Sequence, residues 1–244
     1  MSAASADPEI RLHPRLDAAL VARVYRASGR VHVPDFLAPT SAARIHRALE
    51  QETPWQAVLF DGREHRELPA GLPGAEREAL EAACAAAAAR GFSYRYANFR
   101  IYESRQDGLH MGHFLMRVLE FLNSPDLIAL MRRITGDEAI GYTDAQATRY
   151  RAGDFLTRHD DDVAGKNRRA AYVLGFTPDW VTDWGGLLAF PDRYGHVAEA
   201  FGPSFNSLNL FRVPMPHAVT QVASFAAAPR YSITGWFRSL PASA

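Results

Sequence analysis

From Gly141 to the end, the chain breaks into seven short runs of β-forming residues separated by Gly, Pro, Asp and Asn. The runs are TDAQATRY, DFLTRHDD, RAAYVLGFT, GGLLAF, SLNLFRV, HAVTQV and YSITGWF. Several short strands with turns between them favour a sandwich or a jelly roll. We therefore predict a mainly β fold with flanking helices, whose sandwich or jelly-roll core covers about residues 141–238.

The part of the chain before this core predicts helical support over about residues 40–136. Thr40 or Ser41 is the expected N-cap of a first helix, since a short hydroxyl side chain can accept a bond from a free backbone N–H. Residues 74–90 are dominated by Ala, Glu and Leu, which favour a second helix with Cys84 buried in it. A third helix is expected to open at Ser124-Pro125 and to close at Gly136.

Two other segments before the core are expected to be a strand and a loop. The run FSYRYANFRIY at residues 92–102 alternates aromatic and polar residues, which predicts a strand whose tyrosines belong to the core. Residues 60–74 are rich in Gly, Pro and charge, so we expect an exposed loop. That loop is either a connector or, together with residues 104–113, a lid over a substrate. Arg63, Arg66 and Arg105 in these segments either steer an acidic partner or are simply solvated, as charged loops usually are.

Composition limits the domain count and the classes of partner. The chain has 244 residues, with 27 basic and 27 acidic side chains, so its net charge is zero and no global basic field predicts a nucleic-acid or membrane partner. We expect a flexible segment at residues 1–20 and a single domain at residues 21–244. The lone Cys84, the lack of a long apolar stretch and the lack of a signal-peptide profile predict a cytoplasmic location.

The stretch YRAGDFLTRHDD ends in two residues that a divalent metal could bind. On an extended strand residues two apart face the same side, so His159 and Asp161 are expected to project into one space. His217 opens a later run and is the candidate third ligand. Two imidazoles and one carboxylate leave octahedral positions open, which suits non-haem Fe(II).

Downstream, Arg230 and Ser232 lie two residues apart in RYSITGWF and would share one face of a strand. A guanidinium beside a hydroxyl suits the far carboxylate of a dicarboxylic acid, which it can grip through two parallel bonds. Each residue alone has an ordinary interpretation, because His159 could belong to a solvated acidic turn and Arg230 to the surface. The ordered set on strands of one β region favours a site.

These residues resemble the iron- and 2-oxoglutarate-dependent dioxygenases, and within them the prolyl-hydroxylase branch. The resemblance is carried by YRAGDFLTRHDD, RRAAYVLGFTPDW with WGGLLAF, FNSLNLFRV, and HAVTQV with RYSITGWF. It covers roughly residues 31–238 and is similar both to hydroxylases of a eukaryotic ribosomal protein and to bacterial relatives of the hypoxia-sensing enzymes. The family implies a double-stranded β-helix with the metal at the barrel mouth.

The resemblance implies roles for single residues. His159, Asp161 and His217 would bind the iron, Arg230 would pair with the distal carboxylate of 2-oxoglutarate, and Tyr150 would donate a hydrogen bond to it. The remaining pocket residues implied by the family are Leu156 and Ser232. Gly175 departs from the pattern, because several relatives carry a bulky residue there, and this leaves the size of the pocket open.

The implied reaction uses Fe(II), 2-oxoglutarate and O2 to hydroxylate an unactivated C–H bond, with release of succinate and CO2 and with ascorbate as a stimulant. A prolyl residue of a protein or peptide is the expected substrate, and a free amino acid or small metabolite is the rival. In a different class, the chain would be a non-catalytic sensor that binds metal or 2-oxoglutarate. A jelly-roll metal enzyme that uses no 2-oxoglutarate is a further alternative, and the sequence leaves the oligomeric state open.

Overall fold

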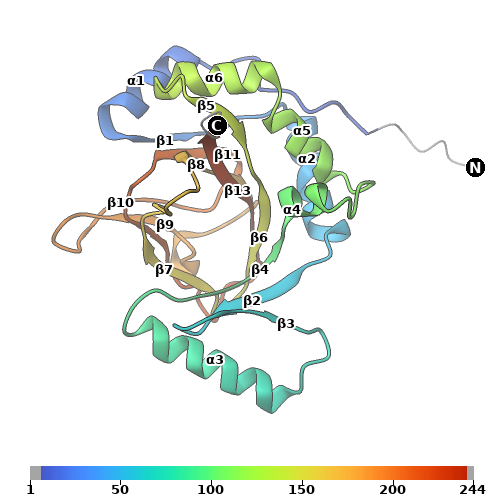
Figure 1. Ribbon diagram of the computed structural model, residues 1–244, viewed down its shortest axis with the longest axis vertical. Coiled ribbons are helices and arrows are strands. Elements are labelled where there is room, and N and C mark those ends of the chain that lie inside the picture. Colours follow the sequence, from blue (N-terminus) through green and yellow to red (C-terminus); the bar gives the residue numbers. More distant parts are fainter. Residues whose placement is uncertain (1–6, 241–244) are drawn as a thin grey trace, which may run out of the picture.

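The computed structural model describes residues 7–240, which form helices around an antiparallel sheet (Figure 1). The helices are α1 (Ala18–Ser28), α2 (Pro39–Arg47), α3 (Gly74–Ala88), α4 (Ile101–Gln106), α5 (Leu115–Leu122) and α6 (Pro125–Thr135), with a π-helical turn η1 (Ala48–Glu52) and a 3₁₀ turn η2 (Thr182–Trp184). No helix in this part of the chain is long and apolar enough to cross a membrane.

All strand pairings are antiparallel. The strands are β1 (Arg30–Val33), β2 (Gln56–Phe60), β3 (His65–Leu68), β4 (Tyr94–Phe99), β5 (Ile140–Thr143), β6 (Gln146–Tyr150), β7 (Phe155–His159), β8 (Arg168–Phe176), β9 (Leu188–Pro191), β10 (Val197–Phe201), β11 (Phe205–Arg212), β12 (His217–Val219) and β13 (Arg230–Ser239). Their order is β1-β11-β8-β13-β6-β4-β7-β12-β9-β10. Off this path, β2 pairs with β4 and with β3, and β5 pairs with β13.

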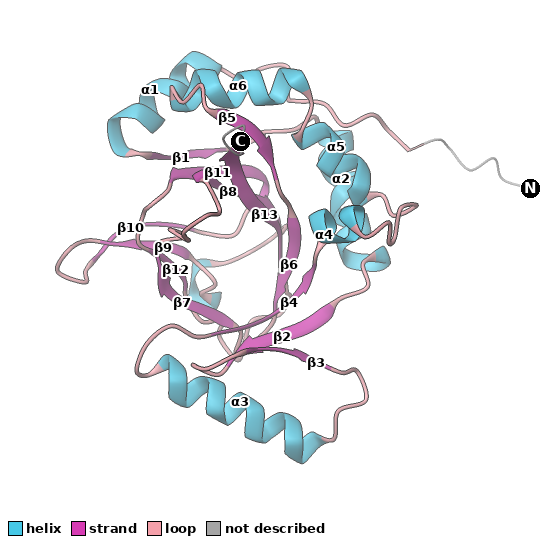
Figure 2. Ribbon diagram, viewed as in Figure 1, coloured by secondary structure: helices cyan, strands magenta, loops and turns pink. Residues whose placement is uncertain are grey.

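The sheet curls round an interior cavity. Side chains of β6, β8 and β13 line one side of the cavity, and side chains of β7, β9 and β12 line the other. The two groups of strands therefore face each other, as the ribbon shows (Figure 2). This nearly closed antiparallel barrel confirms the predicted jelly roll.

The helices cover the outside of the barrel in two places. One large apolar cluster joins α1, α2, α5 and α6 to the sheet through residues such as Tyr25, Ile45 and Leu210. A separate cluster of Leu59, Leu68 and Cys84 fixes α3 against β2 and β3. Helix α3 with this hairpin forms the lower part of the molecule in Figure 1. Burial of Cys84 confirms the expectation for that residue.

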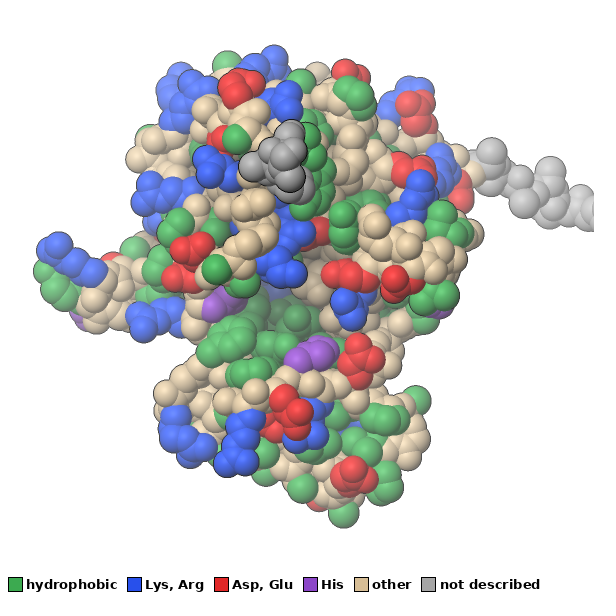
Figure 3. Space-filling model, in the orientation of Figure 1, with side chains coloured by type: hydrophobic (Ala, Val, Ile, Leu, Met, Phe, Trp, Pro, Cys, Tyr) green, Lys and Arg blue, Asp and Glu red, His purple; other side chains and the backbone are tan. Residues whose placement is uncertain are grey.

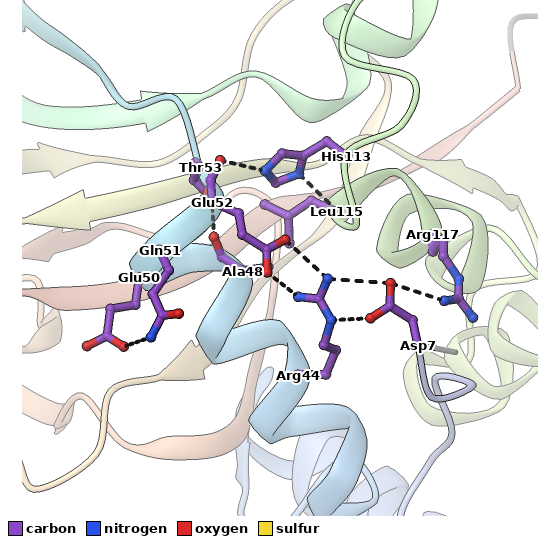
Figure 4. Close-up of polar contacts among 10 residues, drawn as sticks. All are labelled: Asp7, Arg44, Ala48, Glu50, Gln51, Glu52, Thr53, His113, Leu115 and Arg117. Carbon is purple, nitrogen blue, oxygen red and sulfur yellow. Dashed lines mark hydrogen bonds and ion pairs between the residues drawn. The ribbon is translucent and has the colours of Figure 1, made fainter. Parts of the chain in front are cut away.

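A buried arginine joins the first described residues to the helical layer. Arg44 of α2 donates from Nη1 to Glu52 at 2.9 Å and forms an ion pair with Asp7 (Figure 4). Its guanidinium also lies 3.9 Å from the centre of the Phe114 ring. Ile10 is buried, and Leu12 forms a β-bridge. Residues 7–20 therefore have defined contacts, whereas residues 1–6 of the expected flexible segment lie outside the described part. The division of the chain into that segment and one domain stays a prediction.

The N-cap prediction for the first helix was wrong. Helix α2 begins at Pro39 after Ala38, which makes no side-chain cap bond. Proline suits the first helical position because its φ is already helical and it lacks an N–H there. Buried Ser41 instead accepts a bond from the Arg11 N–H and donates to the Glu9 carbonyl. The third helix was predicted correctly, since Ser124 caps α6 and Gly136 ends it in the left-handed conformation.

Two segment predictions need correction. The expected loop at residues 60–74 contains β3, because Asp61 Oδ1 accepts bonds from the N–H groups of Arg63 and Glu64 and closes a hairpin turn. The expected strand at residues 92–102 ends at Phe99, and Ile101 begins α4. All seven predicted β runs contribute strands.

Candidate active site

The structure brings His159, Asp161 and His217 together. Strands β7 and β12 pair with His159 opposite His217, and the two imidazole centroids are 4.1 Å apart. One donor atom from each of the three residues lies within 4.8 Å of the other two. The reason differs from the expected strand alternation, since β7 ends at His159. Asp161 follows it at φ 65°, a left-handed conformation that Asp tolerates better than most residues.

Hydrogen bonds orient both imidazoles. Nδ1 of His159 lies 3.0 Å from the Thr157 carbonyl, and Nδ1 of His217 lies 2.8 Å from the Met215 carbonyl. Each Nδ1–H therefore donates to backbone, which leaves Nε2 with a free lone pair. The Nε2 atoms of His159 and His217 lie 3.4 and 3.5 Å from the two oxygens of Asp161. Three donor atoms thus converge on one point, as a metal ion requires.

Burial sets the charge of these groups. Burial, together with the neighbouring His159, lowers the pKa of His217 to about 4. This imidazole is therefore neutral near pH 7, the form that ligates a metal. Burial by itself raises the pKa of Asp161, but the contacts with His159 and His217 outweigh it and hold this pKa below its usual value. The Asp161 carboxylate therefore stays charged near pH 7.

Arg230 lies deep in the same cavity. It is 4% exposed and pairs directly with Tyr150 between β13 and β6. Its Nη1 has no hydrogen-bond partner among the described residues, and none of the acids there forms an ion pair with it. A buried cation without a partner is costly, often by several kcal/mol. An anionic ligand in the cavity would supply the missing partner.

The other predicted pocket residues differ in position. Tyr150 and Leu156 line the cavity. Ser232 is not among the lining residues, and its hydroxyl lies 2.8 Å from Thr148 Oγ1, which does line it. Gly175 also lies outside the lining, and a Cβ there would meet the Ser204 carbonyl oxygen at 2.5 Å. The missing side chain at Gly175 therefore accommodates a neighbouring loop.

The cavity measures about 490 Å³, and several of its walls were not foreseen. Tyr94 and Tyr96, which were expected to belong to the core, line it together with Phe92. The alternation of aromatic residues along that strand was the available signal. Arg168 and Trp236 also line the cavity, with the Arg168 guanidinium 3.5 Å from the centre of the Trp236 ring. No pattern in the sequence distinguishes these two from surface residues.

The two segments considered as a lid do not line this cavity. Two of the three arginines that were expected to steer a partner form ion pairs with acidic side chains of this chain. Arg66 forms ion pairs with Asp61 and Glu64, and Arg105 pairs with Glu120. The connector interpretation of residues 60–74 fits this arrangement.

Residues 145–238 match the family model described as the 2OG-Fe(II) oxygenase superfamily. This stretch contains the three converging donors and Arg230. Residues 145–238 form a 2OG-Fe(II) oxygenase domain. The expected family is confirmed, and the family implies Fe(II) and 2-oxoglutarate as the groups that the cavity would take.

Two curated relatives support the prolyl-hydroxylase branch. The chain is 29% identical over 153 residues to "Prolyl 3-hydroxylase OGFOD1" of Mus musculus. It is also 29% identical over 116 residues to "Prolyl 3-hydroxylase sudestada1" of Drosophila melanogaster. These matches cover 60% and 40% of this chain but only 28% and 20% of the relatives. The chain therefore matches less than a third of each relative's length.

Solved structures share the fold. A 2OG-Fe(II) oxygenase family protein from Burkholderia pseudomallei has a TM-score of 0.59 at 17% identity, with 93% of each chain covered. A prolyl hydroxylase from Trichoplax adhaerens, in complex with a hypoxia-inducible-factor peptide fragment, has a TM-score of 0.58 at 19% identity, with 91% of this chain and 89% of that chain covered. At these identities the likeness concerns the fold, and it extends over nearly the whole chain.

Proposed function

We propose that this protein is an Fe(II)- and 2-oxoglutarate-dependent dioxygenase that hydroxylates a prolyl residue of a protein or peptide. The observation that carries the proposal is the pairing of two features in one cavity. Three metal-type donors converge in the cavity lining, and buried Arg230, whose Nη1 has no hydrogen-bond partner among the described residues, lines the same cavity. The relatives named as prolyl hydroxylases favour the prolyl substrate over a free amino acid or small metabolite.

In this proposal His159, Asp161 and His217 hold the iron through Nε2, a carboxylate oxygen and Nε2. The bound iron and 2-oxoglutarate, with O2 as second co-substrate, supply the oxidation of an unactivated C–H bond and the release of succinate and CO2. Three ligands from the protein leave room for other ligands on the metal. The oxygenase chemistry belongs to the cofactors, and the protein positions and shields them.

The remaining residues bind the co-substrate and exclude water. Arg230 grips the distal carboxylate of 2-oxoglutarate with a charge-assisted pair of bonds. Burial raises the pKa of Tyr150, so the phenol keeps its proton and donates a hydrogen bond to the same ligand. Leu156, Leu188 and Val219 give the cavity apolar walls. Water-poor surroundings of this kind strengthen each electrostatic contact.

The test is succinate formation by purified protein supplied with Fe(II), 2-oxoglutarate, O2 and proline-containing peptides, with mass analysis for one added oxygen on proline. The proposal expects His217→Ala to abolish turnover, whereas the exposed-surface variant Arg158→Ala keeps it. Full succinate production by His217→Ala would refute the ligand assignment. Binding of 2-oxoglutarate without turnover on any substrate would favour the sensor alternative.

Three lesser expectations belong to the same proposal. Ascorbate is expected to raise the number of turnovers before inactivation, which the succinate assay would measure with and without it. A cytoplasmic location remains a prediction from the sequence, and cell fractionation would test it. Nucleic acid and membranes are not expected as partners, because the chain carries no net positive charge.

A further inference from the structure

Four aromatic rings form a continuous row from the interior of the cavity to its mouth. Tyr150 stacks on Tyr96 at a centroid distance of 5.1 Å, Tyr94 follows at 5.3 Å, and Phe92 lies 5.7 Å beyond Tyr94. All four line the cavity. Exposure differs sharply between the ends of this aromatic row, from 3% at Tyr150 to 42% at Phe92. The row therefore leads from the proposed co-substrate position to solvent.

The outer end of the aromatic row is held by the β2–β3 hairpin and α3. Fully buried Ser93 donates to the Phe60 carbonyl at 2.6 Å. The Tyr94 hydroxyl and His65 Nδ1 are 2.8 Å apart, and the Cys84 thiol lies 3.2 Å from the Tyr94 carbonyl oxygen. Because these contacts come from a helix and a paired strand, the row is a preformed surface. Figure 3 shows a hollow with hydrophobic side chains between this lower part and the rest of the molecule.

The exposed end of the row lies beside the proposed metal site. The Phe92 ring centroid is 5.7 Å from that of His159. A residue of extended chain advances about 3.3 to 3.6 Å. The outer part of the row, Phe92 with Tyr94, spans 5.7 Å and is therefore longer than the advance of a single residue. Its length suits a residue at the metal together with its neighbours in a polypeptide.

The cavity mouth also carries unneutralised negative charge. Asp160 and Asp162 are exposed and line the cavity, and neither forms an ion pair with a described residue. The nearby cation Arg168 is already engaged, since it donates to the Asp161 carbonyl at 3.1 Å and lies over Trp236. Complementary charge mainly affects specificity and association rate. The mouth therefore favours a basic residue near the reacting position.

We propose that Phe92 and Tyr94 form a subsite for the residues flanking the target in an extended protein segment, with a basic flanking residue beside Asp160 and Asp162. The inference rests on the proposed function. It favours a polypeptide substrate over a free amino acid or small metabolite. An apolar or ring-bearing residue next to the target packs on the Phe92 and Tyr94 rings. A free amino acid would leave these rings in water.

The experiment uses two synthetic peptides with one central proline, flanked by an apolar residue and by either lysine or glutamate, and free L-proline as the third probe. Binding to the full chain loaded with Fe(II) and 2-oxoglutarate is measured by calorimetry without oxygen, and KM and kcat follow from succinate release. The lysine peptide is expected to bind about tenfold more tightly than the glutamate peptide, which corresponds to about 1.4 kcal/mol. Free proline is expected not to bind measurably.

Phe92→Ala is expected to weaken lysine-peptide binding about tenfold and to raise KM with little change in kcat, because it removes binding surface away from the reacting atoms. Phe92→Leu should recover part of the loss. The matched control is Phe225→Ala, since Phe225 is 68% exposed and does not line the cavity. Asp160→Asn combined with Asp162→Asn should abolish the preference for the lysine peptide.

Failure of this inference differs from failure of the proposed function. If 2-oxoglutarate binds the iron-loaded protein but Phe92→Ala and Phe225→Ala bind the peptide equally well, the subsite is refuted. Binding of free proline as tightly as the peptides, or of neither peptide, also overturns it. If 2-oxoglutarate and Fe(II) do not bind at all, the proposed function itself has failed.

Discussion

Arg230 and Tyr150 are directly opposite each other on β13 and β6, and the Arg230 guanidinium lies 5.0 Å from the centre of the Tyr150 ring. Both side chains are buried, at 4% and 3% exposure. The sheet pairing thus fixes a cation and a phenol side by side at the inner end of the cavity. The pairing of the two strands therefore positions both groups that would bind an anionic ligand. Their positions depend little on whether the ligand is present.

Removal of the Arg230 guanidinium should weaken 2-oxoglutarate binding by roughly 10- to 100-fold, the range expected for a charge-assisted paired bond. Arg230→Lys keeps the charge but loses the fork and should fall between Arg230→Ala and wild type. Calorimetry on the iron-loaded protein without oxygen measures the three affinities, with Arg158→Ala as the control. Equal affinities in Arg230→Ala and wild type would remove Arg230 from the site.

The metal-free protein should lose stability as pH falls through the range set by His217. The folded pKa of this residue is about 4 against an ordinary 6.5, so the unfolded chain binds a proton first. Its contribution is fully present above about pH 6.5 and declines toward pH 4, by on the order of 3 kcal/mol in total. Urea unfolding near neutral pH and near pH 5 should show a smaller loss in His217→Gln than in wild type. The exposed His196→Gln should behave as wild type, and an identical pH dependence in both variants would contradict the assignment.

Gly175→Ala should destabilise the fold and leave 2-oxoglutarate affinity nearly unchanged. The new Cβ would approach the Ser204 carbonyl oxygen to 2.5 Å and the Ser207 hydroxyl to 2.6 Å, outside the cavity lining. Overpacking of this kind costs about 1 to 3 kcal/mol. Denaturant unfolding measures the loss, and Gly74→Ala is the control because a Cβ there meets nothing within 4 Å. A large change in affinity without a loss of stability would place Gly175 in the pocket.

Arg44→Ala should cost about 2 kcal/mol of unfolding free energy, because it removes bonds to Asp7 and Glu52 and a ring contact with Phe114. The two acids are partly exposed and recover hydration, which limits the loss. Arg11→Ala removes an ion pair whose two side chains are each 69% exposed and should cost less than about 0.5 kcal/mol. Denaturant unfolding measures the free energy of unfolding of both variants. Equal decreases in the two variants would show that the buried Arg44 contacts stabilise the fold no more than the exposed Arg11 ion pair does.

Residues whose chemistry is rare in a strand could be predicted from the sequence. His159, Asp161, His217 and Arg230 stood out because metal donors and a cation recurred among β runs, and the structure brings all four to one cavity. Strand alternation was nevertheless the wrong reason for Asp161, whose left-handed backbone depends on the turn after β7. Their roles as ligands remain predictions until metal binding is measured.

The features missed were those that depend on packing between distant segments. Tyr94 and Tyr96 show the same alternation whether they face a core or a cavity, and only the curvature of the sheet decides between them. Strand β10 was not predicted because four of its five residues, Val197 to Ala200, are exposed and give no apolar pattern. Helix α2 begins at Pro39, directly before the two hydroxyl residues Thr40 and Ser41. The preference for hydroxyl side chains at the N-cap therefore placed the start of this helix too late in the chain.

The most direct test of the account is an anaerobic titration of the purified protein with Fe(II) and 2-oxoglutarate, following the visible charge-transfer band of the metal chelate. The account predicts a band in wild type and in the exposed-residue variant Asp162→Asn, and no band in Asp161→Ala. The absence of a band in wild type, or an undiminished band in Asp161→Ala, would contradict the proposed iron and 2-oxoglutarate site.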